Sequence, residues 1–418
     1  MNRSNYTVGL IMLTFFVISF LTNITGPLIP DIIKGFNLSL TLVALLPFAF
    51  FIAYGVMSIP SGMLLEKYNE KKMMTAAFSV AFFGSLILAL SPNYFNAVLS
   101  LFLIGCGMAI LQVVINPLLR TAGGEEHYAF NSILAQLIFG LASFVSPLVY
   151  SGMVSKLQGQ EIAGGLMALL QRLTPSDLPW ISLYWLFTII SLVMIAIILV
   201  SRFPKVELSQ DEKAGAFQTY IDLFKKRVVI LYFIALFCYV GAEQGVANWI
   251  SQFLFTYHGY DPQSTGAEIV AYFWGLMTAG GVLGLLLVKL MDSRKVLILF
   301  TTLALVCLTL GLFGPGKVAL AAFPLVGFFA SVMYPIIFSL ALNSVKEHHG
   351  SFAGILVTGI VGGAVVPLIV GSLGDMAGLR YGMLFIYIPV GYILSIGFWA
   401  RPIITNKIIT RKKKATAH

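Results

Sequence analysis

Charged residues are scarce in this chain. Asp, Glu, Lys and Arg together make up 10% of its 418 residues, whereas apolar residues make up 58%. Soluble domains carry about 25% charged residues. With a mean hydropathy of +0.91, the chain has more apolar surface than a water-soluble fold can bury. The composition therefore excludes a soluble protein and favours one that lies within a membrane.

Patterns that bind metals or nucleotides are also missing. The three cysteines, Cys106, Cys238 and Cys307, lie inside apolar stretches, and their odd number argues against a disulfide framework. No Cys and His spacing matches a metal site, and no nucleotide-binding loop or nucleophile motif occurs. We therefore expect no enzymatic activity, no cofactor and no metal, and a solute gradient in place of ATP as the source of energy.

Long apolar stretches, in contrast, fill most of the sequence. A membrane-spanning helix needs about 20 apolar residues. Such stretches run at residues 8–30, 42–65, 72–91, 94–119, 128–153, 181–201, 228–256, 265–288, 296–313, 318–343, 351–374 and 381–400. They predict an all-α membrane protein with twelve transmembrane helices in two pseudosymmetric six-helix bundles. The predicted parts are a first bundle at 1–201, a linker at 202–226, a second bundle at 227–402 and a basic tail at 403–418.

The distribution of basic residues predicts the orientation. With twelve spans both termini lie on one side, and only five of the 26 basic residues fall on the other: Lys34, Lys156, Arg172, Lys317 and Arg380. Loops rich in Lys and Arg stay in the cytoplasm. We therefore expect a multi-pass protein of the cytoplasmic (inner) membrane with both termini cytoplasmic. The net charge of +9 then reflects topology, and we expect a monomer in the lipid bilayer that binds no nucleic acid.

Glu243 is the one acidic residue that we place deep inside a span, since the other acids fall in loops or at helix ends. An ionisable side chain within the membrane usually belongs to a substrate or ion pathway. The structural alternative is a hydrogen bond that only ties helices together. We predict that Glu243 couples transport to an ion, and that nearby polar and aromatic residues bind substrate: Tyr239, Gln244, Asn248 and Trp249.

Other polar side chains within spans extend this candidate site. Gln112, Asn116 and Arg120 follow one another at i, i+4 spacing and so share one helix face. Amides suit a substrate with many hydroxyl groups, because they both donate and accept hydrogen bonds. The remaining substrate-binding candidates are Asn23, Asn131, Gln136, Trp274 and Tyr334. We assign a cytoplasmic gate to Glu66, Lys67, Lys71 and Arg120.

Several segments resemble the major facilitator superfamily and, within it, the fucose, glucose and galactose symporter family. The matching segments are residues 239–243 (Tyr-Val-Gly-Ala-Glu), 111–117, which end in Asn-Pro, 334–340 and 362–375. The resemblance implies the major facilitator fold with a central site, and cation-coupled uptake of a monosaccharide. Gln112, Asn116, Glu243 and Tyr334 match the site positions. Similar proton-coupled members carry acids where this chain has Gly26 and Gln112.

The coupling and the substrate class leave alternatives open at this point. The coupling ion is a proton taken up by Glu243 or a sodium ion, or the protein is an uncoupled sugar uniporter. An exporter of drugs or organic ions with the same fold is the main alternative function, since a fold does not fix a function. A membrane sensor is a further alternative, but the 25-residue linker at 202–226 is too short to hold a signalling domain.

Overall fold

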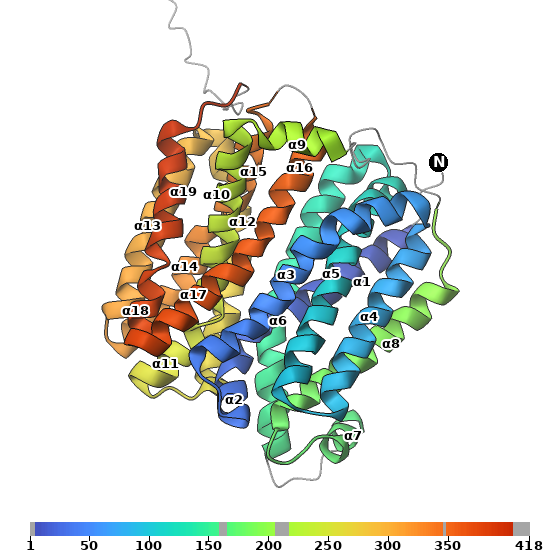
Figure 1. Ribbon diagram of the computed structural model, residues 1–418, viewed down its shortest axis with the longest axis vertical. Helices are drawn as coiled ribbons and strands as arrows, with labels where there is room; N and C mark the ends of the chain where they lie inside the picture. The colour runs from blue at the N-terminus through green and yellow to red at the C-terminus, as the bar shows by residue number, and fades with distance from the viewer. Residues whose placement is uncertain (1–4, 159–164, 205–216, 346–347, 404–418) are drawn as a thin grey trace, which may run out of the picture.

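Twelve membrane-length helices form the structure, a computed structural model that describes residues 5–158, 165–204, 217–345 and 348–403. The number predicted from the sequence is confirmed. The predicted tail at 403–418 lies almost wholly outside the described residues, as does the middle of the predicted linker. The described residues form helices and no strand. The spans run lengthwise in two groups, each of six (Figure 1).

The first bundle takes its spans from seven helices: α1 (Asn5–Thr22), α2 (Thr25–Phe36), α3 (Leu40–Lys67), α4 (Glu70–Leu90), α5 (Tyr94–Gly123), α6 (Tyr128–Gln158) and α8 (Ser182–Val200). Two short helices lie at the ends of the molecule, α7 (Leu166–Leu173) after the fifth span and α9 (Phe217–Phe224) before the seventh (Figure 1). Three-residue turns, η1 (Glu125–His127) and η2 (Pro179–Ile181), precede α6 and α8.

The second bundle repeats this arrangement with more broken helices. Its elements are α10 (Arg227–Ala247), α11 (Ile250–His258), η3 (Pro262–Gly266), α12 (Ala267–Leu290), α13 (Ser293–Phe313), α14 (Gly316–Ala330), α15 (Met333–Leu342), α16 (His349–Thr358), η4 (Gly359–Val361), α17 (Gly362–Ala377), α18 (Leu379–Leu384) and α19 (Tyr387–Trp399).

Proline explains three of the breaks within spans. A proline has no N–H group and cannot bond to the carbonyl four residues earlier. Pro27, Pro335 and Pro389 stand four residues after Asn23, Ser331 and Phe385, where α1, α14 and α18 give way to the next helix. The sequence stretch 228–256, which we predicted as one span, is instead broken between α10 and α11. These breaks free backbone groups and bend the helices near the middle of the molecule.

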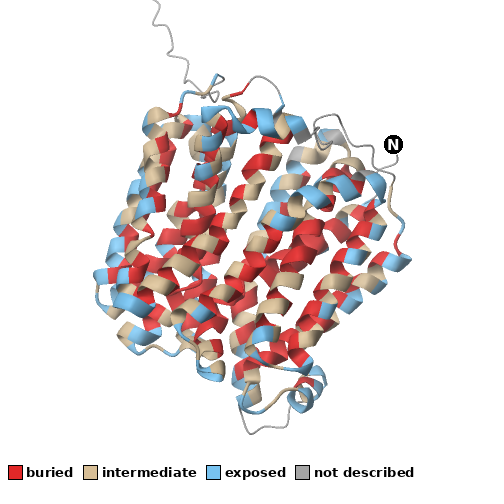
Figure 2. Cartoon of the chain, in the orientation of Figure 1, coloured by how far each residue is buried: buried red, intermediate tan, exposed pale blue. Residues whose placement is uncertain are grey.

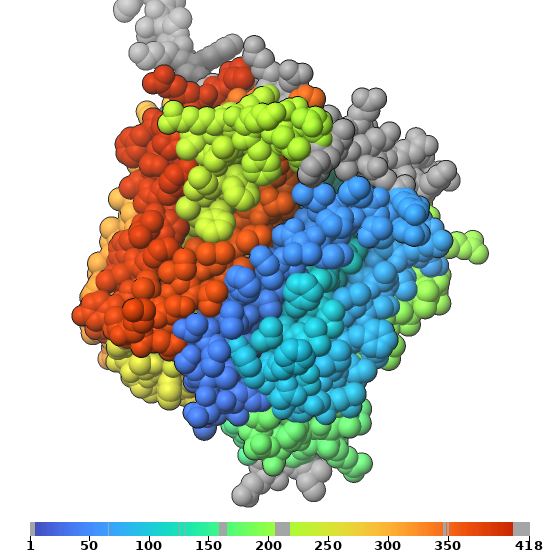
Figure 3. All heavy atoms as spheres, in the orientation of Figure 1, coloured from blue at the N-terminus to red at the C-terminus, as the bar shows by residue number. Residues whose placement is uncertain are grey.

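The contact between the two bundles is formed chiefly by α3 with α17, α6 with α12, and α2 with α11. The seam between α3 and α17 crosses the front of the molecule (Figure 3). Buried residues run through both bundles, and exposed ones gather at the ends and outer sides (Figure 2). We call the end that holds Asn5 and Ile403 the terminal end, and the opposite end, with α7 and α11, the far end (Figure 1).

Candidate functional site

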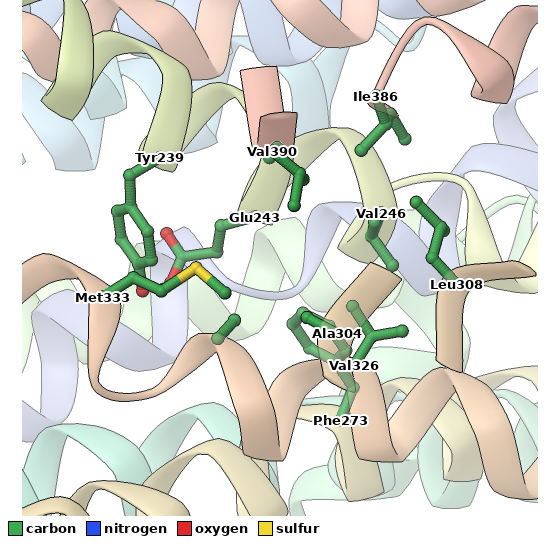
Figure 4. A pocket seen from close by; sticks show the side chains of 12 residues that line it. Tyr239, Glu243, Val246, Phe273, Ala304, Leu308, Val326, Met333, Ile386 and Val390 are labelled. Atoms are coloured by element: carbon green, nitrogen blue, oxygen red, sulfur yellow. The ribbon is translucent and has the colours of Figure 1, made fainter. Parts of the chain in front are cut away.

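Glu243 lies inside the second bundle and pairs with a tyrosine of its own helix. Tyr239 precedes it by four residues on α10, which places both side chains on one face. The Tyr239 hydroxyl donates a hydrogen bond of 3.0 Å to Glu243 Oε1. The ring of Tyr334, from α15, lies 5.7 Å from that of Tyr239. Figure 4 shows Tyr239 and Glu243 pointing toward one another beside Met333. The structure therefore brings three of the predicted site residues together.

The surroundings of this pair are mostly apolar. Beside Glu243 lies a cavity of about 20 Å³, lined also by Ala242, Val246, Phe273, Met333, Ile386 and Val390 (Figure 4). Its volume suits about one water molecule and not a larger solute. Glu243 is half-buried. Withdrawal of an ionised carboxylate from water is costly unless it is paired, and the ion pairs resolved among the described residues involve other acids. Binding of a proton by Glu243 removes that cost.

Three more predicted residues lie at the break between α10 and α11, Gln244 in the last turn of α10 and Asn248 and Trp249 in the break itself. Gln244 and Asn248 are 6% and 3% exposed, and Asn248 Nδ2 has no hydrogen-bond partner in the described part of the chain. Trp249 is fully buried, and its indole Nε1 donates to the carbonyl of Pro367 on α17 over 3.3 Å. Trp249 thus joins two parts of the second bundle, whereas the side-chain N–H groups of Asn248 remain available as hydrogen-bond donors.

Asn23 forms the centre of a small polar network in the first bundle. Its Nδ2 donates to Ser143 Oγ over 2.9 Å, and Ser19 and Ser143 share a hydrogen bond of 2.6 Å. The network joins α1 to α6 at the point where the first span breaks. Asn131 lies elsewhere, near the terminal end of α6, where its side chain packs against Gly123.

Two other amides of the first bundle, Asn116 and Gln136, have exposed side chains. Asn116 is exposed, although the rest of α5 from Asn96 to Arg120 is buried or half-buried. Its Nδ2 donates to the Gln112 carbonyl of its own helix over 3.1 Å, which leaves its oxygen available. Gln136 on α6 is exposed, and Gln112 is half-buried. Because an amide is unfavourable against lipid, we infer that Asn116 faces the space between the bundles.

The remaining predicted residues differ in their surroundings. Trp274 on α12 is 6% exposed, and its indole nitrogen is buried without a partner among the described residues. Of the predicted gate, Lys71 donates to the carbonyls of Leu199 and Ser201 at the end of α8, within its own bundle. Lys67 is exposed and Arg120 half-buried, and the side chain of Glu66 lies outside the described part.

Two acids at the far end, Asp31 and Asp375, were predicted only to lie in loops or at helix ends, but both bond to the opposite bundle. Asp31 on α2 accepts hydrogen bonds from Tyr150 in its own bundle and from Gln263 in the other. Asp375, at the end of α17, accepts from the backbone N–H groups of Leu40 and Thr41 on α3. Hydropathy places such acids near a membrane surface, but it gives no sign that they join two bundles.

No group of three or more His, Cys, Asp or Glu side chains that could hold a metal ion occurs among the described residues. Comparison with known proteins gives a consistent result instead. The profile of the Major Facilitator Superfamily matches residues 11–367. The chain is 30% identical over 407 residues to a glucose/galactose transporter of Brucella abortus, with 95% of each chain covered. It is 26% identical to the L-fucose-proton symporter of Escherichia coli, with 87% of this chain and 86% of that one covered.

Solved structures agree on the fold. The crystal structure of the Escherichia coli fucose:proton symporter superposes with a TM-score of 0.67 at 21% identity, covering 96% of this chain and 100% of that one. A bacterial homolog of the human lysosomal transporter Spinster gives a TM-score of 0.77 at 14% identity, covering 94% and 96%. At these identities the likeness concerns the fold alone.

Proposed function

This chain belongs to the major facilitator superfamily and is a transporter, and we propose that its substrate is a monosaccharide, a hexose or related sugar, moved across the cytoplasmic membrane by alternating access. The observation that carries the proposal is the 30% identity to a glucose/galactose transporter over 95% of both chains. In such transporters two bundles rock about a site near the middle of the membrane. The terminal end is then cytoplasmic, as the basic residues predict.

The sugar site that we propose lies between the bundles. The exposed amides of Asn116 and Gln136, the half-buried Gln112 and Tyr334, and the unpaired donors of Asn248 and Trp274 supply hydrogen-bonding groups. Sugar hydroxyls need partners of this kind, since each one both donates and accepts. The cavity beside Glu243 is too small for a sugar, so Glu243 acts next to the substrate and not as its main contact.

We propose that uptake is coupled to protons and that Glu243 binds the coupling proton. Glu243 is held by Tyr239, in surroundings where a neutral carboxyl is favoured. The L-fucose relative is named a proton symporter. In the first bundle, this chain has Gly26 and Gln112 at the two positions where similar proton-coupled proteins carry an acid. The coupling proton is therefore bound in the second bundle. We also propose that the chain consists of a first bundle at 1–201, a linker at 202–226 and a second bundle at 227–402, and that the protein is a monomer.

Uptake of a panel of radiolabelled sugars into proteoliposomes tests this function. The vesicles carry an imposed proton gradient, an imposed sodium gradient or neither. We expect uphill accumulation of one hexose or a related sugar under the proton gradient alone. Accumulation under sodium alone would refute the proposed ion, and transport of no sugar in any condition would refute the proposed substrate.

A further inference from the structure

Two carboxylates cross the contact between the bundles at the far end. Asp31 belongs to the first bundle and bonds to the second, and Asp375 belongs to the second and bonds to the first. The proposed function assigns neither of them a role. The two carboxylates therefore join the bundles at two separate points, one bond starting from each bundle.

Asp31 joins three segments. On its own bundle the Tyr150 hydroxyl of α6 donates to Oδ2. Across the contact, Gln263 Nε2 of η3 lies 3.0 Å from Oδ1 and 3.1 Å from Oδ2. Hydrogen bonds to an ionised carboxylate are about twice as strong as those between neutral groups. This one side chain therefore ties α2 and α6 to the start of the eighth span.

Asp375 reaches the beginning of α3. Its Oδ1 accepts from the Leu40 N–H and its Oδ2 from the Thr41 N–H, both over 2.8 Å. The first N–H groups of a helix have no partner within that helix, and a negative charge is favourable there. The end of α17 thus caps a helix of the other bundle with a charge-assisted pair of hydrogen bonds.

We propose that Asp31 and Asp375 are positioning residues that form a far-end latch, which holds the bundles in the state closed at the far end. The inference rests on the alternating access of the proposed function. Opening at the far end separates α2 from η3 and α17 from α3, so the latch bonds exist in one state only. A bond that exists in one state shifts the equilibrium toward that state. Loss of either carboxylate should raise the ratio of far-end-open to far-end-closed protein by about tenfold or more.

Asp177 supplies a control at the same end. It is exposed and lies in the first bundle between α7 and η2, and no hydrogen bond to the second bundle is resolved for it among the described residues. Asp177→Ala therefore removes a far-end carboxylate without breaking a bond between the bundles, and we expect the equilibrium to stay within about twofold of the parent protein.

Spin labels at the far end measure the equilibrium directly. Ser91, directly after α4, and Lys317, in the first turn of α14, are both exposed and lie at the far end of the first and second bundles. After Cys106, Cys238 and Cys307 are replaced, cysteines at these two positions carry the labels. Double electron–electron resonance on the full chain in nanodiscs, without sugar, then gives the populations with long and short distances. We expect Asp31→Ala and Asp375→Ala each to raise the long-distance population by about tenfold relative to the short one.

A second variant tests the Asp31 bond from the other side. Gln263→Ala should match Asp31→Ala, and the double variant should add little to either, since both remove one interaction. Distance distributions for Asp31→Ala, Gln263→Ala and Asp375→Ala that equal the one for Asp177→Ala would overturn the latch. Because no sugar is present, a failure of the sugar assignment leaves this result unaffected and shows separately in the uptake panel.

Discussion

Gly26 on α2 lies where the first and seventh spans approach each other closely. A Cβ atom added there would lie 2.4 Å from the Ala247 carbonyl oxygen and 3.4 Å from Asn248 Cα. To restore a normal contact, α2 and the end of α10 must move apart by about 1 Å. Overpacking of this kind costs about 1–3 kcal/mol. The cost falls on the far-end-closed state only, so Gly26→Ala should favour the far-end-open state by about 5- to 150-fold.

Hydrogen–deuterium exchange in nanodiscs measures this shift. We expect Gly26→Ala to speed the exchange of far-end amides in α2 and in α11, because these helices lose their mutual cover when the far end opens. Gly9→Ala is the matched control, because Gly9 belongs to the same span and an added Cβ there meets no atom within 4 Å. Equal exchange in the two variants would refute the steric reasoning.

Three further predictions concern single side chains. Asn116→Ala should raise the KM for sugar uptake by about tenfold, which initial uptake rates measure. The Tm should not change, since the resolved bond of this side chain is to Gln112 of its own helix, and thermal unfolding checks this. Trp249→Phe should lower the free energy of unfolding by about 1 kcal/mol, because the Pro367 carbonyl loses its donor, and a thermal unfolding assay measures the loss. Asp292 caps α13 and bonds to Arg294, which holds the pKa of the Asp292 carboxyl below its ordinary 3.8. The ionised form is therefore the stabilising one. Asparagine caps a helix about as well as aspartate but loses the ion pair with Arg294, so Asp292→Asn should lower the free energy of unfolding by about 0.5 kcal/mol at neutral pH, a difference that vanishes as the pH falls through that lowered pKa.

The sequence was sufficient to predict the spans, because the length of an apolar stretch alone decides whether a helix can cross a bilayer. It did not predict the breaks, although three of them stand four residues before Pro27, Pro335 and Pro389. The mean hydropathy of a window of residues stays high across such a break, so two helices are predicted as one continuous span. The break between α10 and α11 contains no proline, and its local signal is a pair of glycines, Gly241 and Gly245, which allow a helix to bend but do not fix where it ends.

The candidate site was predictable only in part. The i, i+4 spacing of Tyr239 and Glu243 placed them on one helix face, and their hydrogen bond follows from it. The contact with Tyr334 depends on how α10 packs against α15, which a single sequence does not reveal. For the same reason Asp31 and Asp375 were assigned to helix ends, whereas the structure shows that each bonds to the opposite bundle.

The role of Glu243 is tested most directly by transport of the Glu243→Gln variant in proteoliposomes. Glutamine keeps the size of the side chain and can still accept from Tyr239, but it cannot bind or release a proton. We expect the variant to lose uphill sugar accumulation under a proton gradient and to retain sugar exchange between the two sides at equal pH. Unchanged uphill accumulation would contradict this expectation and remove Glu243 from the coupling mechanism.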